Sequence, residues 1–164
     1  MPATALNPAE QFSALDGLTV LFLPVVAATT LIPTRAEINA GTDLSTELAD
    51  PPEGFTLTSE KIDTPKLAKR FTGSIPGRIT AEDSSMMLYT DRGGDDVRDV
   101  LPRDTKGYIV LMDSGDVPGD LMDVWPVQVN SLTKVRAGDA ATMHRVTFNI
   151  TELPAEDVVI PTAP

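Results

Sequence analysis

The chain has 164 residues, of which 41% are apolar and 5% aromatic, and its formal net charge at pH 7 is −11. This composition fits one soluble domain and excludes a disordered chain. The absence of cysteine excludes a disulfide scaffold, a thiolate zinc site and a cysteine nucleophile. The excess of 24 acidic over 13 basic residues disfavours a sequence-reading DNA-binding module, which needs a basic footprint.

The first quarter of the chain predicts an arm, a strand and a helical turn. Residues 1–17 are small, polar and proline-containing, which is typical of a mobile or docking arm. Residues 18–26 form an apolar run that predicts a strand buried on both faces; Pro24 and its length exclude a membrane-spanning helix. No basic residue precedes this run, so we expect no export signal. Residues 34–40 predict one helical turn capped by Thr34.

Residues 55–80 predict a long hairpin arm that begins after the turn at 50–54. Residues 55–63 alternate apolar and polar side chains, which is typical of a half-buried strand. Residues 70–80 predict a second strand, with bends where glycine and proline fall. The segment between them, residues 64–70, would be the tip of the hairpin.

This hairpin is basic in an otherwise acidic chain. From residue 61 to residue 78 there are five basic side chains against one acid, Asp63. The five are Lys61, Lys66, Lys69, Arg70 and Arg78. We favour an arm that meets the acidic face of a neighbouring copy, because copies of a highly charged protein need local charge complementarity to associate. A solvated loop and a phosphate-binding patch are the alternatives.

The second half of the chain predicts further strands and one short helix. Strands are expected at 84–90, 107–113, 122–135 and 142–151, with a break near Asn130 and with 107–113 central and buried on both faces. The helix is expected over Asp96, Val97, Arg98, Asp99, Val100 and Leu101, ended by Pro102. Residues 154–164 predict an acidic C-terminal tail with one β-prone patch, VVI, at 158–160. The whole is mainly β: a β-sandwich or open barrel over residues 18–153 with one short flanking helix.

Few residues offer chemistry. Asp113, Asp116 and Asp120 lie in a stretch rich in aspartate, and a divalent cation there is an alternative to the favoured reading of helix caps and turns. The single histidine, His144, falls in a strand-like stretch and is interpreted as a core or surface residue. No nucleophile–base pair can be assembled, so we expect neither an enzyme nor a cofactor.

Several segments, in order, resemble the major tail (tail tube) protein of long-tailed, siphovirus-type bacteriophages that infect actinobacteria. They are IPTRAEINAGTDL (32–44), TSEKIDTPKLAKRFTGSIPGRITAEDSSMMLYTD (58–91), DDVRDVLPRDTKGYIVLMDSGD (95–116), MDVWPVQV (122–129) and FNITELPAEDVVIP (148–161). The phrases PGRITAEDSS and LPRDTKGYIV are the most specific, and none of the segments is a catalytic motif. The resemblance covers roughly residues 18–161.

The resemblance implies a tail-tube fold and a structural role in the virion tail, assembled in the host cytoplasm. It implies that six copies close a ring and that rings stack into a tube around a tape-measure protein, through which DNA later passes without specific binding. Tail terminator and tail-tip proteins would be further partners. The hairpin, the N-terminal arm and the C-terminal tail would contact other copies. Small polar residues of the hairpin are candidates to face the lumen: Thr56, Thr58, Thr72 and Ser74.

Two other functions stay open from sequence. One is a head–tail joining or tail-terminator ring, or a capsid decoration protein, which use related β folds. The other is a calcium-dependent binding module.

Overall fold

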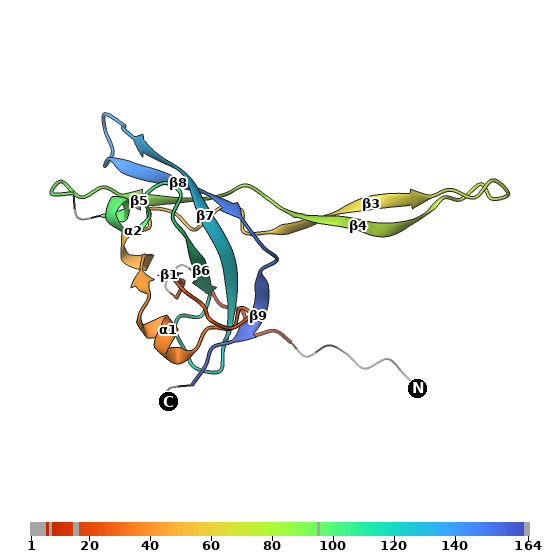
Figure 1. Cartoon of the computed structure of the whole chain (residues 1–164), viewed down its shortest axis with the longest axis horizontal. Helices are drawn as coiled ribbons and strands as arrows, with labels where there is room; N and C mark the ends of the chain where they lie inside the picture. The colour runs from red at the N-terminus through yellow and green to blue at the C-terminus, as the bar shows by residue number, and fades with distance from the viewer. Residues whose placement is uncertain (1–5, 7, 15–16, 95, 163–164) are drawn as a thin grey trace.

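The computed structural model describes residues 6, 8–14, 17–94 and 96–162. Strands dominate it, as predicted (Figure 1). In chain order the elements are β1 (Thr19–Leu23), α1 (Arg35–Asn39), β2 (Thr42–Asp43), η2 (Ser45–Glu47), β3 (Leu57–Thr64), β4 (Gly73–Ala81), β5 (Ser84–Tyr89), α2 (Val97–Val100), β6 (Lys106–Met112), β7 (Leu121–Val135), β8 (Met143–Ile150) and β9 (Ala155–Val159).

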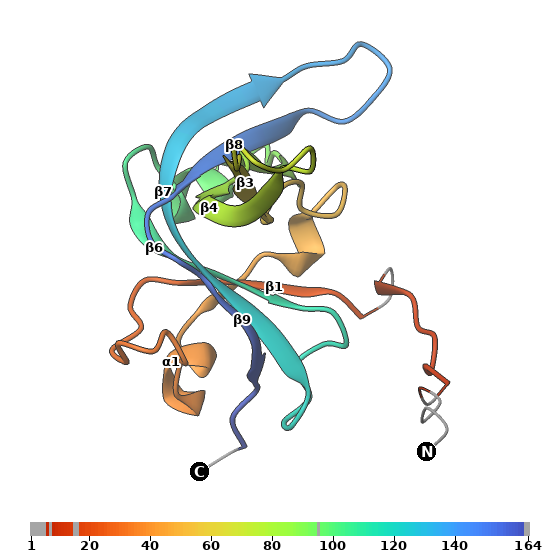
Figure 2. The ribbon, with the colours of Figure 1, turned by 90° about the vertical axis from the view of Figure 1, so that its right-hand side faces the viewer.

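The body of the protein is one seven-stranded antiparallel sheet with the order β2-β1-β6-β7-β8-β5, and β9 pairs with β7. β7 is long enough to pair with two strands along one edge. Leu121–Val124 pair with β9, and Val127–Val135 pair with β8. The register with β8 shifts between Val129 and Ser131, which places a bulge at the predicted break near Asn130. Figure 2 shows β7 and β8 curling over, so the sheet forms a half-barrel, the open-barrel form of the expected fold.

Both faces of this sheet are covered, because two hydrophobic clusters share its central strands. Val20 and Phe22 of β1 join the cluster around Trp125, whereas Leu21 and Leu23 join the cluster around Met112. A central strand buried on both faces has a continuous apolar sequence, which explains the runs at 18–26 and 107–113. Both runs are strands, as predicted, and β6 lies between β1 and β7.

Two short α-helices flank the sheet, one more than the fold class expected from the sequence. α1 starts at the Thr34 cap, where the Thr34 hydroxyl accepts from the backbone of Glu37 and the Glu37 carboxylate accepts from the backbone of Thr34. This reciprocal capping box fixes the single turn predicted at 34–40, and Ile38 anchors the turn in the second cluster. No helix in the described part of the chain is long and apolar enough to cross a membrane.

The expected C-terminal tail at 154–164 is wrong for most of its described length. Residues Ala155–Val159 form β9, and Ile160 is fully buried in the second cluster. Burying Ile160 beside the otherwise free edge of β7 stabilises this strand despite its two adjacent acids. The body therefore extends to Ile160. Of the predicted N-terminal arm, residues 1–5, 7, 15 and 16 lie outside the described residues; Leu6 and Phe12 are exposed.

Candidate assembly interface

A two-stranded arm made of β3 and β4 leaves the body and extends along the long axis of the molecule (Figure 1). Its root is fixed by Phe55, whose ring packs edge-on against Trp125 at a centroid distance of 5.7 Å. The buried Ser84 hydroxyl accepts the Phe55 backbone N–H at 3.0 Å and donates to the Glu82 carbonyl. Gly54 has a φ of +79°, and a Cβ there would lie 2.3 Å from the Asp83 carbonyl oxygen. Only glycine fits this turn into the arm.

The arm is exposed on both faces, which corrects the expectation of a half-buried strand at 55–63. Ile62 pairs with Ile75, and Ser59 pairs with Ile79. These three isoleucines keep 49%, 53% and 54% of their surface exposed. The apolar face that the alternation indicated, with Phe55 and Leu57, packs against the body, whereas no other described element covers the isoleucines further along the arm. Exposed apolar surface on an unsupported two-stranded sheet is typical of an interaction surface.

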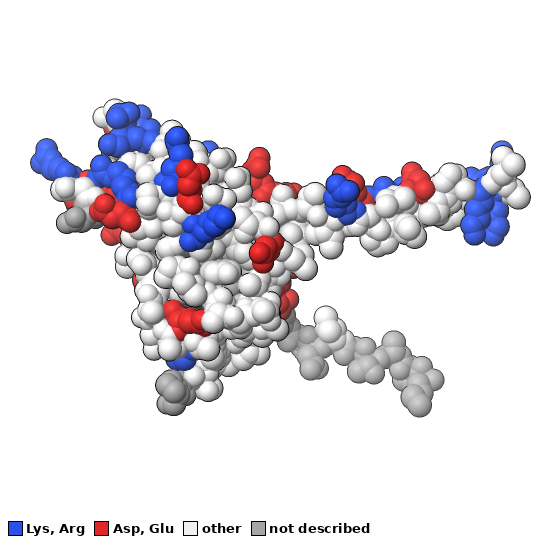
Figure 3. All heavy atoms as spheres, viewed as in Figure 1, with Lys and Arg blue, Asp and Glu red and all other residues white. Residues whose placement is uncertain are grey.

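The five basic residues singled out from the sequence all lie on the arm and are all exposed. Lys61 and Arg78 lie along the strands, and the Lys61 ammonium is 2.9 Å from the Asp63 carboxylate. Lys66 and Lys69 close the turn at the tip, where the Lys69 N–H donates to the Lys66 carbonyl at 3.0 Å. Arg70 follows. Figure 3 shows the resulting basic cluster at the end of the arm.

The four small polar residues proposed to face a lumen are exposed on the arm but do not form one face. Thr58 pairs with Thr80, and Ser74 pairs with Asp63. Thr58 and Asp63 are five positions apart in one strand, so they point to opposite sides of it. Thr56 and Thr72 lie just outside the two strands. The lumen assignment stays a prediction, and it can hold for only part of this set.

The short helix expected at 96–101 is α2, with Asp96 as its N-cap and Leu101 as its C-cap. The Asp96 carboxylate accepts from the backbone N–H of Arg98 at 2.9 Å and from its Nε at 2.8 Å. Burial raises the pKa of Asp96. The hydrogen bonds from Arg98, a further hydrogen bond from the Asp91 N–H, and the positive charge of Arg98 lower it. Together they outweigh burial and bring the pKa to about 2. α2 is thus held by a capped, ion-paired start, while Val97 and Leu101 anchor it in the core.

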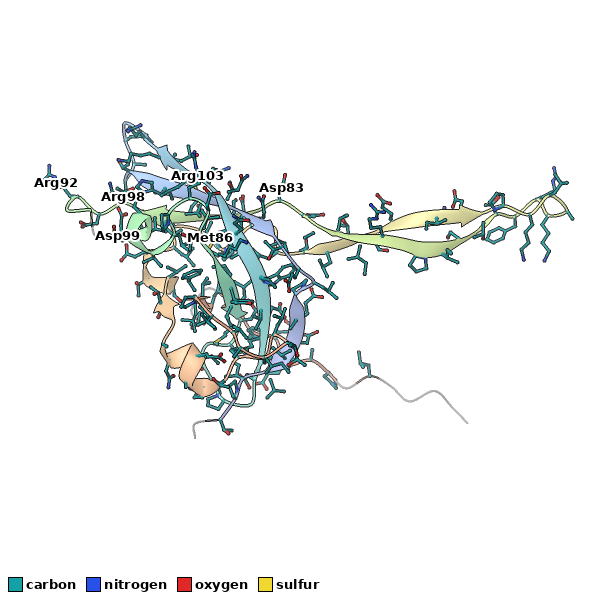
Figure 4. All side chains as sticks on the ribbon, in the orientation of Figure 1. Asp83, Met86, Arg92, Arg98, Asp99 and Arg103 are labelled. Carbon is teal, nitrogen blue, oxygen red and sulfur yellow. The ribbon has the colours of Figure 1, made fainter. Side chains whose placement is uncertain are left out.

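A second basic cluster, which the sequence reasoning missed, lies near the loop that joins β7 to β8 (Figure 3). Lys134, Arg136 and Arg98 are close enough to His144 to lower its pKa, although burial is the larger cause of that shift. The pairing of β7 with β8 sets Arg145 beside Thr133. A charge count over residues 134–145 would have found this cluster, because the segment has three basic residues against one acid. Arg98 and Arg103, labelled in Figure 4, lie at the same end of the body.

The aspartates considered as a cation site serve other roles. Asp116 forms a two-pronged ion pair with Arg35 of α1. Among the residues that the structure describes, no three acidic or histidine side chains gather where they could hold a metal ion. The ion pair with Arg35 accounts for Asp116, and a cation site at Asp113, Asp116 and Asp120 has no support from the geometry of the described residues.

His144 is a core residue. It is 3% exposed, and its Nδ1 lies 2.8 Å from the Thr90 hydroxyl. This contact ties the end of β8 to the segment that follows β5, which is a structural role. Burial lowers the pKa of His144, so the ring stays neutral and matches its surroundings.

A curled half-barrel with a projecting arm, exposed apolar strands and clustered charge defines a structural subunit built to contact other chains. The sequence profile of the phage tail tube proteins matches residues 7–163. The chain belongs to the phage tail tube protein family. No curated protein sequence is a significant match.

Solved structures with a similar fold come from tail and injection machines. A chain from the tail of an empty GTA particle with C6 symmetry has a TM-score of 0.57 and 7% identity, with 92% of this chain and 100% of that chain covered. The sheath/tube terminator of the extracellular contractile injection system PVC gives 0.58 and 11%, covering 92% and 97%. A chain from the six-fold symmetrised baseplate of the anti-feeding prophage gives 0.56 and 10%, covering 90% and 95%. At these identities the likeness shows the fold.

Proposed function

We propose that this chain is the structural subunit of the tail tube of a long-tailed phage. Six copies close a ring, and rings stack into a hollow conduit. The family profile spans nearly the whole chain, and two of the similar structures are described with six-fold symmetry. The quoted segments resemble tail proteins of phages that infect actinobacteria, so such a host is part of the proposal.

The observation that carries this proposal is the arm. An isolated two-stranded sheet is marginal in water, and this one also exposes isoleucines on its two faces. A neighbouring copy that covers the arm and pairs its free edges removes both liabilities. A protein that acts as a monomer gains nothing from such an arm.

The tube would surround a tape-measure protein and later pass DNA. A charge of −11 per copy becomes about −66 for six copies, which would repel DNA phosphates and keep the DNA from sticking to the conduit. Tail terminator and tail-tip proteins would bind the two ends of the tube. The assembled protein would reside in the virion tail after assembly in the host cytoplasm.

The proposal assigns no catalytic activity to the chain. His144 is buried and bonded to Thr90, so it is not available to a substrate. The chain has no cysteine to serve as a nucleophile. The family and the similar structures also point to a structural role.

Negative-stain microscopy of the purified protein over a range of concentration and salt tests the proposal. Rings with six-fold symmetry that stack into tubes are expected. Monomers under every condition would overturn the tube function. Single rings that never stack would favour the second candidate, a tail-terminator ring, which one similar structure motivates.

A further inference from the structure

A groove of about 310 Å³ lies between the β2–η2 segment and α2. Its floor is apolar, and the side chains that form it are Leu44, Leu88, Val97 and Val100. The volume equals roughly that of ten water molecules, which is room for an incoming apolar side chain. Nothing else in the described chain fills this space.

The rim of the groove is acidic. Asp43, Glu47 and Asp99 line it and are exposed. An adjoining hollow of about 250 Å³ shares Glu47 and adds Asp91. Neither the groove nor the hollow has a lysine or arginine in its described lining. Arg98 lies nearby, but its guanidinium is paired with Asp96.

The tip of the arm has the complementary character. The turn closed between Lys66 and Lys69 sets Leu67 at its apex, where the side chain is fully exposed. Arg70 follows, and no acidic residue occurs from residue 64 to residue 81. The tip is therefore an apolar knob surrounded by three cations, which matches an apolar floor surrounded by acids.

The groove cannot receive the arm of its own chain. The arm points along the long axis of the molecule, and α2 lies at the other end of that axis (Figure 1). Asp99, labelled in Figure 4, is at this far end. The occupant must be the arm of a second copy. A contact that joins opposite ends of identical molecules is heterologous, so it repeats from copy to copy and does not stop at a symmetric dimer.

We propose that the tip of the arm of one copy docks in the acidic groove of the next copy, with Leu67 on the apolar floor and Lys66, Lys69 and Arg70 against the acidic rim. The contact joins successive rings. This inference rests on the proposed tube function, because it requires the chain to assemble.

A larger hollow of about 500 Å³ at the root of the arm is the competing site within the same molecule. It also contains acids, among them Glu82 and Glu152. Ile79 of the arm lines this hollow, whereas its neighbour Arg78 points to the opposite face of the strand, so charge alone does not separate the two sites. The groove beside α2 lies at the opposite end of the molecule from the arm, and the root hollow serves as the control site.

Cysteine cross-linking tests the docking directly, because the chain has no cysteine of its own. Chains with Leu67→Cys are mixed with chains carrying Asp99→Cys, assembled, and oxidised. A disulfide needs Cα atoms within roughly 7 Å, so only residues in contact are joined. The matched control replaces Asp99→Cys with Glu152→Cys in the root hollow. Glu47→Cys is a second reporter for the groove. All four positions are exposed, and circular dichroism checks that each variant folds.

A heterodimer on a non-reducing gel with Asp99→Cys or Glu47→Cys, at least roughly tenfold stronger than with Glu152→Cys, supports the docking. Tubes that form without this link, or that link to residue 152 instead, overturn the docking and leave the tube function intact. Failure of the unmodified chain to assemble at all overturns both.

Discussion

Ile62 of β3 and Ile75 of β4 face each other across the arm, yet each keeps about half of its surface in solvent. Such a pair stabilises a hairpin by less than about 1 kcal/mol. The remaining apolar surface contributes only when another surface covers it. Covering these isoleucines by another copy therefore stabilises the arm more than their contact within the monomer does.

Replacing Ile62 and Ile75 tests whether they stabilise the assembly more than the monomer. Ile62→Thr combined with Ile75→Thr keeps two β-branched side chains, so we expect the monomer to lose at most about 1 kcal/mol of stability. Assembly should weaken by about 1–2 kcal/mol, which is roughly a tenfold rise in the concentration needed for rings or tubes. Thermal melts and sedimentation measure the two effects.

Val25→Thr is the control for this pair, because Val25 is a β-branched residue outside the two arm strands and is 62% exposed. It should leave assembly unchanged. Equal loss of assembly in the control and in the arm variant would contradict a special role for the arm faces.

The fold was predictable where the sequence pattern reports local chemistry. The apolar runs of β1 and β6 predicted central strands, and Thr34 followed by Glu37 signalled the start of α1. β9 was predicted only in part: the β-prone patch at 158–160 overlaps its end, but two adjacent acids in its sequence, AEDVV, disguised the rest. Its pairing depends on the length of β7, which leaves an edge free at Leu121–Val124. The alternation at Phe55 and Leu57 predicted an apolar face, which the body covers, but it did not predict the exposed isoleucines further along the arm.

Of the two surfaces of the candidate interface, the sequence predicted only the basic arm and not the acidic groove. The basic residues of the arm are contiguous in sequence, so a charge count finds them. The acidic groove is assembled from residues near 43, 88 and 97, which only the folded chain brings together. The basic cluster at the end of β7 and β8, by contrast, could have been found by a charge count over residues 134–145.

Reversing the charge of the tip is the direct test of its electrostatic role. Lys66→Glu, Lys69→Glu and Arg70→Glu together should leave the monomer folded, since all three side chains are exposed. Tube growth should be lost, because the tip would repel an acidic neighbour. Assembly of the unmodified chain should also weaken as salt rises. Light scattering and microscopy follow both effects.

The matched control for this reversal changes the exposed residues Arg92, Arg103 and Lys106 to glutamate, which alters net charge by the same amount. Assembly that survives the tip reversal, or that fails equally in the control, would count against the assembly role of the tip.

The hydrogen bond between Ser84 and Phe55 at the root of the arm should contribute to the free energy of unfolding of the monomer. Ser84→Ala removes the hydroxyl that accepts the Phe55 N–H and leaves that buried donor without its partner. We expect a loss of about 1–3 kcal/mol in the free energy of unfolding. Amide exchange at Phe55 should speed up as the root loosens. Ser59→Ala, at an exposed position of the arm, is the control and should change stability by less than about 0.5 kcal/mol. A Ser84→Ala melt indistinguishable from that of the control would refute this role.

The Asp96–Arg98 pair predicts a pH dependence of known sign. The folded pKa of Asp96, about 2, lies below the ordinary aspartate pKa of 3.8. Its contribution is therefore fully present above about pH 4 and is lost as the pH falls toward 2, because the unfolded chain binds the proton first. The shift corresponds to about 2 kcal/mol, and the Asp96 side chain is only 4% exposed.

Asp96→Ala should consequently cost about 2 kcal/mol at neutral pH and much less near pH 2, as measured by denaturant unfolding at both values. Asp99→Ala removes an exposed carboxylate of the same helix and should cost less than about 0.5 kcal/mol at neutral pH. A cost for Asp96→Ala that stays constant between the two pH values would mean that the carboxylate is not the charged, bonded cap described above.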